Sequence, residues 1–401
     1  MFTLFSSVRA CRHPAKPALI CGAVLALASS QGFSQAAENT EESVTKKSSR
    51  QLEEVVVTAR RTSESAQDVP IAVSAMSSDD LRRESINSAN DLNGKVPSLI
   101  ISTGSTMRNV EIPTIRGQGS QFGSAPGVVV YMSEAPLPAD PIANYQGGPG
   151  KFFDLANLQI LKGSQGTLFG RNTTGGVMLL EPEKPHEEFA LSIRAGVSRM
   201  DAEGGIEADG YSYEAVVNVP VFGDRLMARL GGQVFSREGF TRDVVTGKDY
   251  DSKGYRVARF GLLWQPTDRI ENYFLANYVD SDDNGTGNVI ERINREGLNK
   301  AIPSAIGAGA LTAIIPGVDL SQSANAGCLL LNYYGPSSNC GQDILDEQAA
   351  RSVREVQLSG APNDILTSGL YLDKFSYQLT DALTLVNIAS FSTMDHTYRW
   401  D

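Results

Sequence analysis

Residues 159–172 read QILKGSQGTLFGRN, the most distinctive segment of the sequence. Its three glycines, Gly163, Gly166 and Gly170, are spaced somewhat like those of a phosphate-binding loop. Such a loop ends in Lys-Ser or Lys-Thr, which meet the phosphate and its metal ion. Arg171 follows the last glycine here, so the segment lacks the residues that would bind a nucleotide. The glycines at 117–119 also fail as a dinucleotide motif, because the following helix and the final glycine are missing.

The residues around this segment, 62–185, predict a compact α+β domain with long loops. The runs 69–73 and 127–131 are rich in β-branched residues, which favours strands. Ser78 is placed to cap a helix whose first turn is acidic, as the helix dipole prefers.

After Pro185 the hydrophobic pattern changes to a period of two, which predicts strands with one apolar face. Tight turns are predicted at 222–224, 266–268 and 379–381, whereas the links after Ser198, Ser236 and Asp280 are longer. Short turns on one side and long loops on the other are typical of an outer-membrane β-barrel. The seven predicted strands are 191–198, 211–221, 226–236, 255–265, 270–280, 370–378 and 384–393.

The N-terminus predicts export from the cytoplasm. Arg9, Arg12 and Lys16 precede an apolar run, 18–28, that is too short to cross a bilayer. A small-residue cleavage site follows, so residues 1–36 are predicted to be a signal peptide.

Residues 37–61 are predicted to be a periplasmic tether. Up to residue 51 they have almost nothing to bury, which favours disorder. Val55, Val56, Val57 and Thr58 then favour an extended strand. Such a strand is suited to adding itself to another protein's sheet edge, or to beginning the next domain, and the local sequence leaves both open.

Composition excludes several classes of function. The formal net charge is -11, and no basic run interleaves with aromatic residues, so a nucleic-acid surface is not expected. No stretch of about 20 apolar residues exists that would form a membrane helix. Beyond the signal peptide the histidines are His186 and His396. No Cys-His or paired-carboxylate arrangement stands out, so we expect neither an enzyme nor a cofactor.

These features together resemble the TonB-dependent outer-membrane receptor family. Residues 159–172 resemble its plug signature, E-V-L-R-G-P-Q-G-T-L-Y-G-R-N, with Gln159 in place of the acid and Ser164 in place of the proline. Ile115-Arg116-Gly117 resembles the I-R-G motif of the plug. Residues 52–61 resemble the TonB box, which an energising inner-membrane partner grips.

The resemblance implies an α+β plug domain over residues 62–185. Residues 186–401 would then be the first antiparallel strands of a transmembrane β-barrel of about 22 strands. It also implies an importer in the cell outer membrane, in contact with its lipid, with TonB and with a nutrient ligand such as a ferric siderophore or similar chelate. The segment that TonB would contact is Glu53, Glu54, Val55, Val56, Val57, Thr58 and Ala59.

Three basic residues, Arg116, Lys162 and Arg171, are candidates for a plug lock. In the family, basic residues like those at Arg116 and Lys162 face acids on the barrel wall. Their alternative role is as solvated charges of a polar barrel interior, which we favour for Arg171 and leave open for the other two.

The predicted strands are too few to enclose a plug, since a barrel of about eight strands is filled by its own side chains. We therefore expect this sequence to stop before its barrel closes. The alternative function is a truncated, non-transporting remnant or a surface binding protein.

Asp280, Asp282, Asn284, Gly285 and Glu291 match the calcium-loop spacing D-x-[DN]-x-[DN]-G-x5-E. The pattern brings alternate oxygens around a hard cation. Its flanks here are a strand and a loop rather than two helices, so an acidic surface loop is favoured over a weak calcium site.

Cys328 and Cys340 are the cysteines outside the signal peptide, and we predict that they form a disulfide in a long loop. Closing a loop of this length would stabilise the fold by roughly 3 kcal/mol. Mass spectrometry of unreduced peptides from the exported protein should find the two residues joined. Alkylation of both thiols without prior reduction would contradict the pairing.

Overall fold

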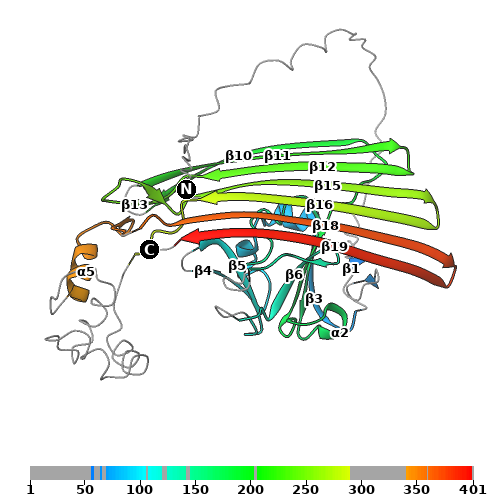
Figure 1. Cartoon of the computed structure of the whole chain (residues 1–401), viewed down its shortest axis with the longest axis horizontal. Helices are drawn as coiled ribbons and strands as arrows, with labels where there is room; N and C mark the ends of the chain where they lie inside the picture. Colours follow the sequence, from blue (N-terminus) through cyan, green and yellow to red (C-terminus); the bar gives the residue numbers. More distant parts are fainter. Residues whose placement is uncertain are drawn as a thin grey trace, which may run out of the picture. The chain divides into compact units, whose positions relative to one another are not determined.

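The computed structural model describes residues 56–57, 64–65, 69–104, 107–119, 124–140, 145–202, 206–289, 340–358 and 360–399. A mixed five-stranded sheet precedes a seven-stranded antiparallel sheet, and smaller sheets accompany both (Figure 1). Within these residues no helix is both long enough and apolar enough to cross a membrane.

The five-stranded sheet organises residues 69–182, which we call the N-terminal domain. Its strands β6 and β9 run parallel, and its other neighbouring pairs are antiparallel. Across the sheet the order is β3 (Ala72–Ser77), β8 (Leu155–Lys162), β9 (Gly176–Pro182), β6 (Val128–Met132) and β7 (Ala135–Pro136). The domain also contains α1 (Ser78–Arg83), the 3-10 helix η1 (Ala89–Leu92), β4 (Leu99–Gly104), β5 (Met107–Ile115) and α2 (Gly166–Phe169).

The start of α1 differs slightly from the prediction. The helix is capped by Ser77 rather than Ser78, and the predicted strand at 69–73 begins only at Ala72. The Ser77 hydroxyl accepts from the Asp80 amide at 3.2 Å, and the Asp80 carboxylate accepts from the Ser77 amide at 3.0 Å. This reciprocal capping box satisfies two amides that the first turn leaves unpaired, which fixes the boundary one residue earlier.

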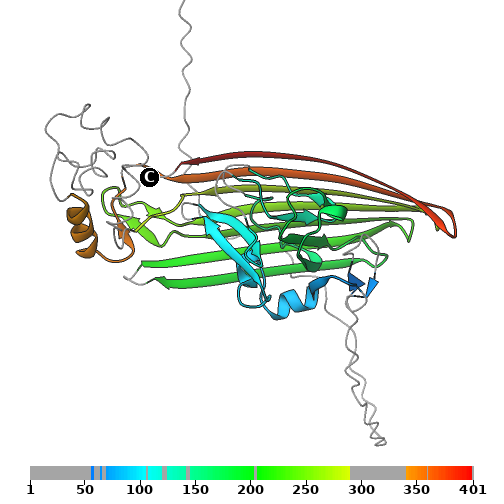
Figure 2. The ribbon, with the colours of Figure 1, turned by 90° about the horizontal axis from the view of Figure 1, so that it is seen from below.

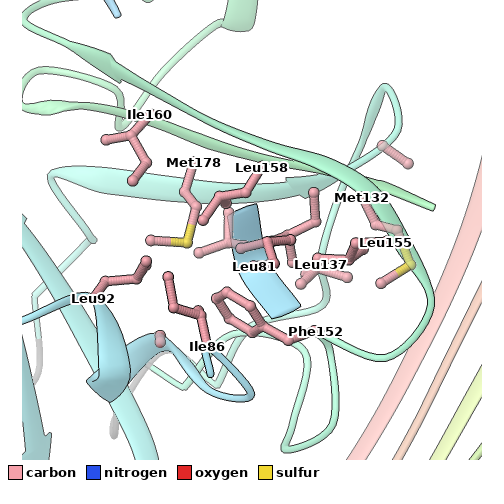
Figure 3. Close-up of a cluster of buried hydrophobic side chains, with 14 of the residues drawn as sticks. Leu81, Ile86, Leu92, Met132, Leu137, Phe152, Leu155, Leu158, Ile160 and Met178 are labelled. Atoms are coloured by element: carbon pink, nitrogen blue, oxygen red, sulfur yellow. The ribbon is translucent and has the colours of Figure 1, made fainter. Parts of the chain in front are cut away.

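The central strands of this sheet are buried on both faces. Leu158, Ile160 and Met178 belong to a cluster with Leu81 and Ile86 (Figure 3). The intervening residues of the same strands pack on the opposite face, against Tyr131 and Phe169; they are Leu161, Val177 and Leu179. Because neither face meets water, β8 and β9 are nearly continuous apolar runs rather than alternating ones.

The seven-stranded sheet confirms the strands predicted from the period of two. Its order follows the chain, so every neighbouring pair is antiparallel and adjacent in sequence order within the sheet (Figures 1 and 2). The strands are β10 (Ala190–Ala202), β11 (Ile206–Phe222), β12 (Leu226–Arg237), β15 (Lys253–Thr267), β16 (Ile270–Asp283), β18 (Asn363–Thr380) and β19 (Leu383–Arg399).

The three predicted tight turns join β11 to β12, β15 to β16 and β18 to β19. The predicted long link after Ser198 is wrong, because β10 continues to Ala202 and β11 already begins at Ile206. At these strand ends the outward positions become polar: Asp201 pairs with Glu207, and Arg199 forms an ion pair with Asp209 at 2.9 Å. The apolar residues Met200 and Ala208 lie on the other face, so the apolar positions change phase where the strand still continues.

The two faces of the long sheet have different partners. Leu263, Tyr273 and Leu372 point toward the N-terminal domain and join its buried cluster. Residues of the opposite phase, such as Ile193 and Phe391, are 72% and 65% exposed and form an apolar outer face.

Smaller elements lie in the long links between β12 and β15 and between β16 and β18. A three-stranded sheet contains β14 (Asp249–Tyr250), β13 (Thr241–Asp243) and β17 (Glu355–Val356), and helix α5 spans Cys340–Ala349. Near the N-terminus, β1 (Val56–Val57) pairs antiparallel with β2 (Glu64–Ser65).

Candidate functional site between the N-terminal domain and the long strands

Asp154 of the N-terminal domain is held by two arginines of the long strands. Its carboxylate accepts hydrogen bonds from Nε and Nη2 of Arg229 on β12, at 2.8 and 2.6 Å. Arg259 on β15 donates to the backbone carbonyls of Phe153 and Asp154, and its Nε donates to Asn277 at 2.9 Å. We call Asp154, Arg229 and Arg259 the Asp154 grip.

The backbone presents Asp154 to both arginines. Its φ of 49° lies in the left-handed region, which aspartate tolerates better than most residues. Its carbonyl also accepts from the Glu183 amide at 3.0 Å, which ties the turn to the end of β9. A side chain at Gly231 would place Cβ 2.7 Å from the Phe153 ring, so this glycine allows β12 to approach the turn closely.

The grip is largely shielded from water. The side chains of Asp154 and Arg229 are 12% and 14% exposed, and Arg259 is buried. Removing one member of such a pair leaves an uncompensated charge, which typically destabilises a protein by about 3–5 kcal/mol. Removal of either charge should therefore weaken the contact between the N-terminal domain and the long strands.

A second polar cluster joins the end of β9 to β16 and β18. Glu134 forms an ion pair with Lys374, and Lys184 Nζ lies 3.2 Å from Glu271 Oε1. Glu181 lies beside them. Burial, and after it the charge of Glu134, raises the pKa of Glu181 to about 7, against the opposing effect of Lys184 and Lys374.

A third contact lies near the opposite end of the strands. His396 on β19 places Nδ1 2.9 Å from the Asp140 carboxylate and Nε2 2.8 Å from that of Asp364 on β18. The Tyr145 ring stacks on the imidazole, with ring centroids 5.4 Å apart. The His396 side chain is 4% exposed, so this contact is buried.

An ion pair inside the N-terminal domain supports the same region. Lys151 Nζ lies 2.6 Å from Glu111 Oε2, and both side chains are buried. The other carboxylate oxygen of Glu111 accepts from the Ala89 amide at 3.1 Å. Burial raises the pKa of Glu111, but the charges of Lys151 and Lys253 outweigh it, so the pKa lies below its usual value.

A cavity of about 600 Å³ lies beside the Asp154 grip. Helix α1, the turn at 152–155 and strands β10 to β12 contribute to its walls. Its lining carries charges of both signs, namely Arg82, Arg194, Arg229, Asp154, Glu183 and Glu214. The cavity is therefore polar space along the boundary between the N-terminal domain and the long strands.

The three residues of the predicted plug lock are more exposed than the grip. Arg116 and Arg171 are exposed, and Lys162 is half-buried at the end of β8. A Cβ at Gly163 would lie 3.4 Å from Arg116 Nη1, which places Arg116 beside Lys162. Burial, and then the charge of Arg116, lowers the pKa of Lys162. Among the described residues, none of the three forms an ion pair.

Several other predicted residues fall partly outside the described ranges. Of the TonB-box residues the structure describes Val56 and Val57, and Glu53, Glu54, Val55, Thr58 and Ala59 lie outside it. Cys328 and Glu291 also lie outside, whereas Cys340 begins α5.

The predicted loop at residues 280–283 is instead the end of β16, paired with β18. The segment is extended, so its first positions do not form the compact calcium-loop shape. Asn284 Nδ2 donates to the Asp249 carbonyl at 3.0 Å. Within the described ranges, no cluster of three or more histidine, cysteine or acidic residues is arranged to hold a metal ion.

The sequence analysis missed the residues of the Asp154 grip, although one signal for them exists. Arg229 and Arg259 lie in phase with Met227 and Leu263, whose side chains join the buried cluster. Charged residues on the inward phase of an alternating strand require a partner. That partner, Asp154, is distant in the sequence and cannot be identified from the strand pattern alone.

Comparison with known proteins finds a family match that overlaps the N-terminal domain. Residues 65–177 match the family described as TonB-dependent Receptor Plug Domain. The ferric yersiniabactin uptake receptor FyuA from Yersinia pestis aligns with a TM-score of 0.59 and 15% identity, over 82% of this chain and 42% of that one. The siderophore receptor PiuA from Acinetobacter baumannii aligns with a TM-score of 0.57 and 14% identity, over 86% and 39%. The chain thus spans about 40% of the length of these receptors, and the likeness shows the fold.

The pKa of Glu181 predicts a pH-dependent stability of the N-terminal domain. Its folded pKa of about 7 lies above the ordinary value of 4.5, so the folded state binds the proton more tightly. The stability is therefore complete below pH 4.5 and falls as the pH rises through about 7. Glu181→Gln should stabilise the domain at about pH 9, by at most roughly 3 kcal/mol, and leave it unchanged at about pH 4.

Urea-induced loss of protease resistance at both pH values measures this difference. Glu188→Gln, at an exposed position, is the matched control and should change neither value. Equal midpoints for wild type and Glu181→Gln at about pH 9 would contradict the assignment.

Proposed function

Since residues 65–177 are a TonB-dependent receptor plug domain, followed by strands with the receptor fold, we propose that this protein is an energised outer-membrane receptor that takes up a scarce ligand. The family consists of transporters rather than enzymes, and its members reside in the outer membrane. In this proposal the long strands cross the outer membrane, and the N-terminal domain is the plug that gates them.

The observation that best supports gating is the nature of the contact between plug and strands. Asp154, Glu134 and Asp140 of the plug each meet a basic partner on a long strand. Charge-assisted contacts of this kind depend strongly on geometry and are lost over a short displacement. A polar cavity beside Asp154 would give water access to the contact once the plug begins to move.

The ligand we propose is a ferric siderophore or a similar chelate. FyuA and PiuA are described as receptors for ferric yersiniabactin and for a siderophore, respectively. The apolar outer face of the long sheet supports a location in lipid, because outward residues of membrane strands contact the hydrocarbon.

TonB is the proposed energising partner, and residues 53–59 are its proposed contact. Val56 and Val57 lie in an extended strand, the conformation in which a segment adds to another protein's sheet. Arg116 and Lys162 are retained as part of a proposed plug lock. Arg116 and Lys162 are adjacent cations on the plug, and an acidic side chain of the strands that lay close to them would stabilise their charged forms.

The test combines uptake with partner binding. In cells that lack other receptors, this protein should support TonB-dependent uptake of radioactive iron from one of a panel of siderophores. Val56→Pro removes a backbone donor from the pairing strand, so it should abolish uptake. The same substitution in a peptide of residues 50–62 should weaken binding to purified TonB by at least about tenfold.

Gln51→Pro, which lies before the proposed contact, is the control and should leave uptake and peptide binding unchanged. Equal binding of the wild-type and Val56→Pro peptides would count against strand addition. Failure of the wild-type protein to take up any chelate of the panel would count against the importer and favour the alternative, a non-transporting remnant or a surface binding protein.

A further inference from the structure

His396 makes two contacts that together require an extra proton. A carboxylate only accepts hydrogen bonds, and a neutral imidazole carries one N–H. Both ring nitrogens of His396 lie within 2.9 Å of a carboxylate oxygen, one of Asp140 and one of Asp364. Two such contacts need two protons, which the doubly protonated imidazolium supplies.

The imidazole holds both arms of one plug hairpin, which we call the Asp140 hairpin. Its arms are residues 137–140 and 145–147. The Asp140 amide donates to the Tyr145 carbonyl, and the Gly147 amide donates to the Pro138 carbonyl, both at 2.9 Å. Asp140 binds His396 from one arm, and the Tyr145 ring stacks on it from the other.

The base of the hairpin also approaches the strands closely. A Cβ at Gly148 would lie 2.8 Å from the Leu366 side chain and 3.2 Å from that of Val279. The described arms of the hairpin therefore pack directly against the long strands. His396 joins the hairpin to both β18 and β19.

We propose that doubly protonated His396 positions the Asp140 hairpin against β18 and β19, and that loss of one ring proton releases the hairpin as a step in opening the plug. This inference rests on the proposed function, because it treats the hairpin as part of the gate. His396 acts here as a positioning residue, since it acts through the hairpin.

The groups around the imidazole favour the protonated form. Asp140 faces it from the hairpin and Asp364 from β18, and Tyr398 lies beside it on β19. Burial raises the pKa of Tyr145, and the charges of Asp364, Glu111 and Asp283 raise it further, which places these acids around the same hairpin. Of these acids, Glu111 is itself affected by the charges of Lys151 and Lys253.

Loss of the second ring proton would leave a lone pair of the imidazole facing a buried carboxylate. The side chains of Asp364 and Asp140 are 5% and 12% exposed, so water cannot readily replace the lost hydrogen bond. An unsatisfied buried charge destabilises the arrangement that contains it. The hairpin should therefore be held at lower pH and released as the pH rises.

The ring state can be observed directly by nitrogen NMR of the full chain labelled at histidine, in detergent or membrane vesicles. Both nitrogens of His396 should have the shifts of an imidazolium at about pH 6. His396→Gln identifies the signal by its disappearance. A neutral ring at about pH 6 would overturn the proposal.

Movement of the hairpin can be followed by thiol labelling. Leu137 is buried in the hairpin, and Ala135 is buried in the neighbouring strand β7. Leu137→Cys should be labelled roughly tenfold faster at about pH 9.5 than at about pH 6, the factor expected for one charge-assisted hydrogen bond. Rates are read by mass spectrometry of the peptide and divided by those of the unfolded chain at the same pH. Ala135→Cys is the control and should remain protected at both pH values.

Two further variants separate positioning from general stability. In the Leu137→Cys background, His396→Gln should give fast labelling at both pH values. Asp364→Asn should give slow labelling at both, because its amide can donate to Nε2 of a neutral imidazole. Slow labelling in His396→Gln, or an unchanged pH dependence in Asp364→Asn, would overturn the proposal. If labelling of Leu137→Cys depends on pH as expected but the wild-type protein takes up no chelate, only the proposed function is refuted.

Discussion

The carboxylate of Asp154 is buried against the long strands, and a buried carboxylate has to be neutralised by partners with good geometry. Arg229 meets it with two parallel hydrogen bonds, and Arg259 binds the adjacent carbonyls. Gly231 allows β12 to approach Phe153 closely, and the Glu183 amide binds the Asp154 carbonyl in the turn that leads into β8. Apolar contacts such as Tyr273 and Leu372 add area to the interface. The polar contacts set its register, because charged groups tolerate little misalignment.

The distribution of charge differs from what the family resemblance implied. That resemblance placed basic residues on the plug opposite acids on the strands. In the described part of the interface the plug mainly contributes acids, Asp154, Glu134 and Asp140, and the strands contribute Arg229, Lys374 and His396. Arg116 and Lys162 instead lie next to each other, and among the described residues neither forms an ion pair. A plug held in this way would respond to proton concentration through Glu181 on β9 of the plug and His396 on the long strand β19.

The sequence predicted the long strands well, because the alternation of Leu191 and Ile193 with polar neighbours is a local signal. It failed where strands extend beyond the outward apolar residues, as at Asp201 and Asp282, since the apolar alternation that marks the strand is interrupted there. The grip could be predicted only in part. Arg229 is in the inward phase of its strand, but its partner lies 75 residues away and is brought there by tertiary folding. The TonB-box prediction depends on a resemblance, and the structure adds the extended conformation of Val56 and Val57.

A double-mutant cycle between Asp154 and Arg229 tests most directly whether the grip holds the plug. Asp154→Asn keeps a residue that tolerates positive φ, Arg229→Gln removes the charge, and the third variant carries both changes. The free energy of plug release would be measured from urea-dependent protease resistance of the full chain. The account predicts that each single variant loses about 3 kcal/mol or more, and that the double variant loses at least about 2 kcal/mol less than their sum. Additivity within about 0.5 kcal/mol would show that the two residues act independently and would contradict the account.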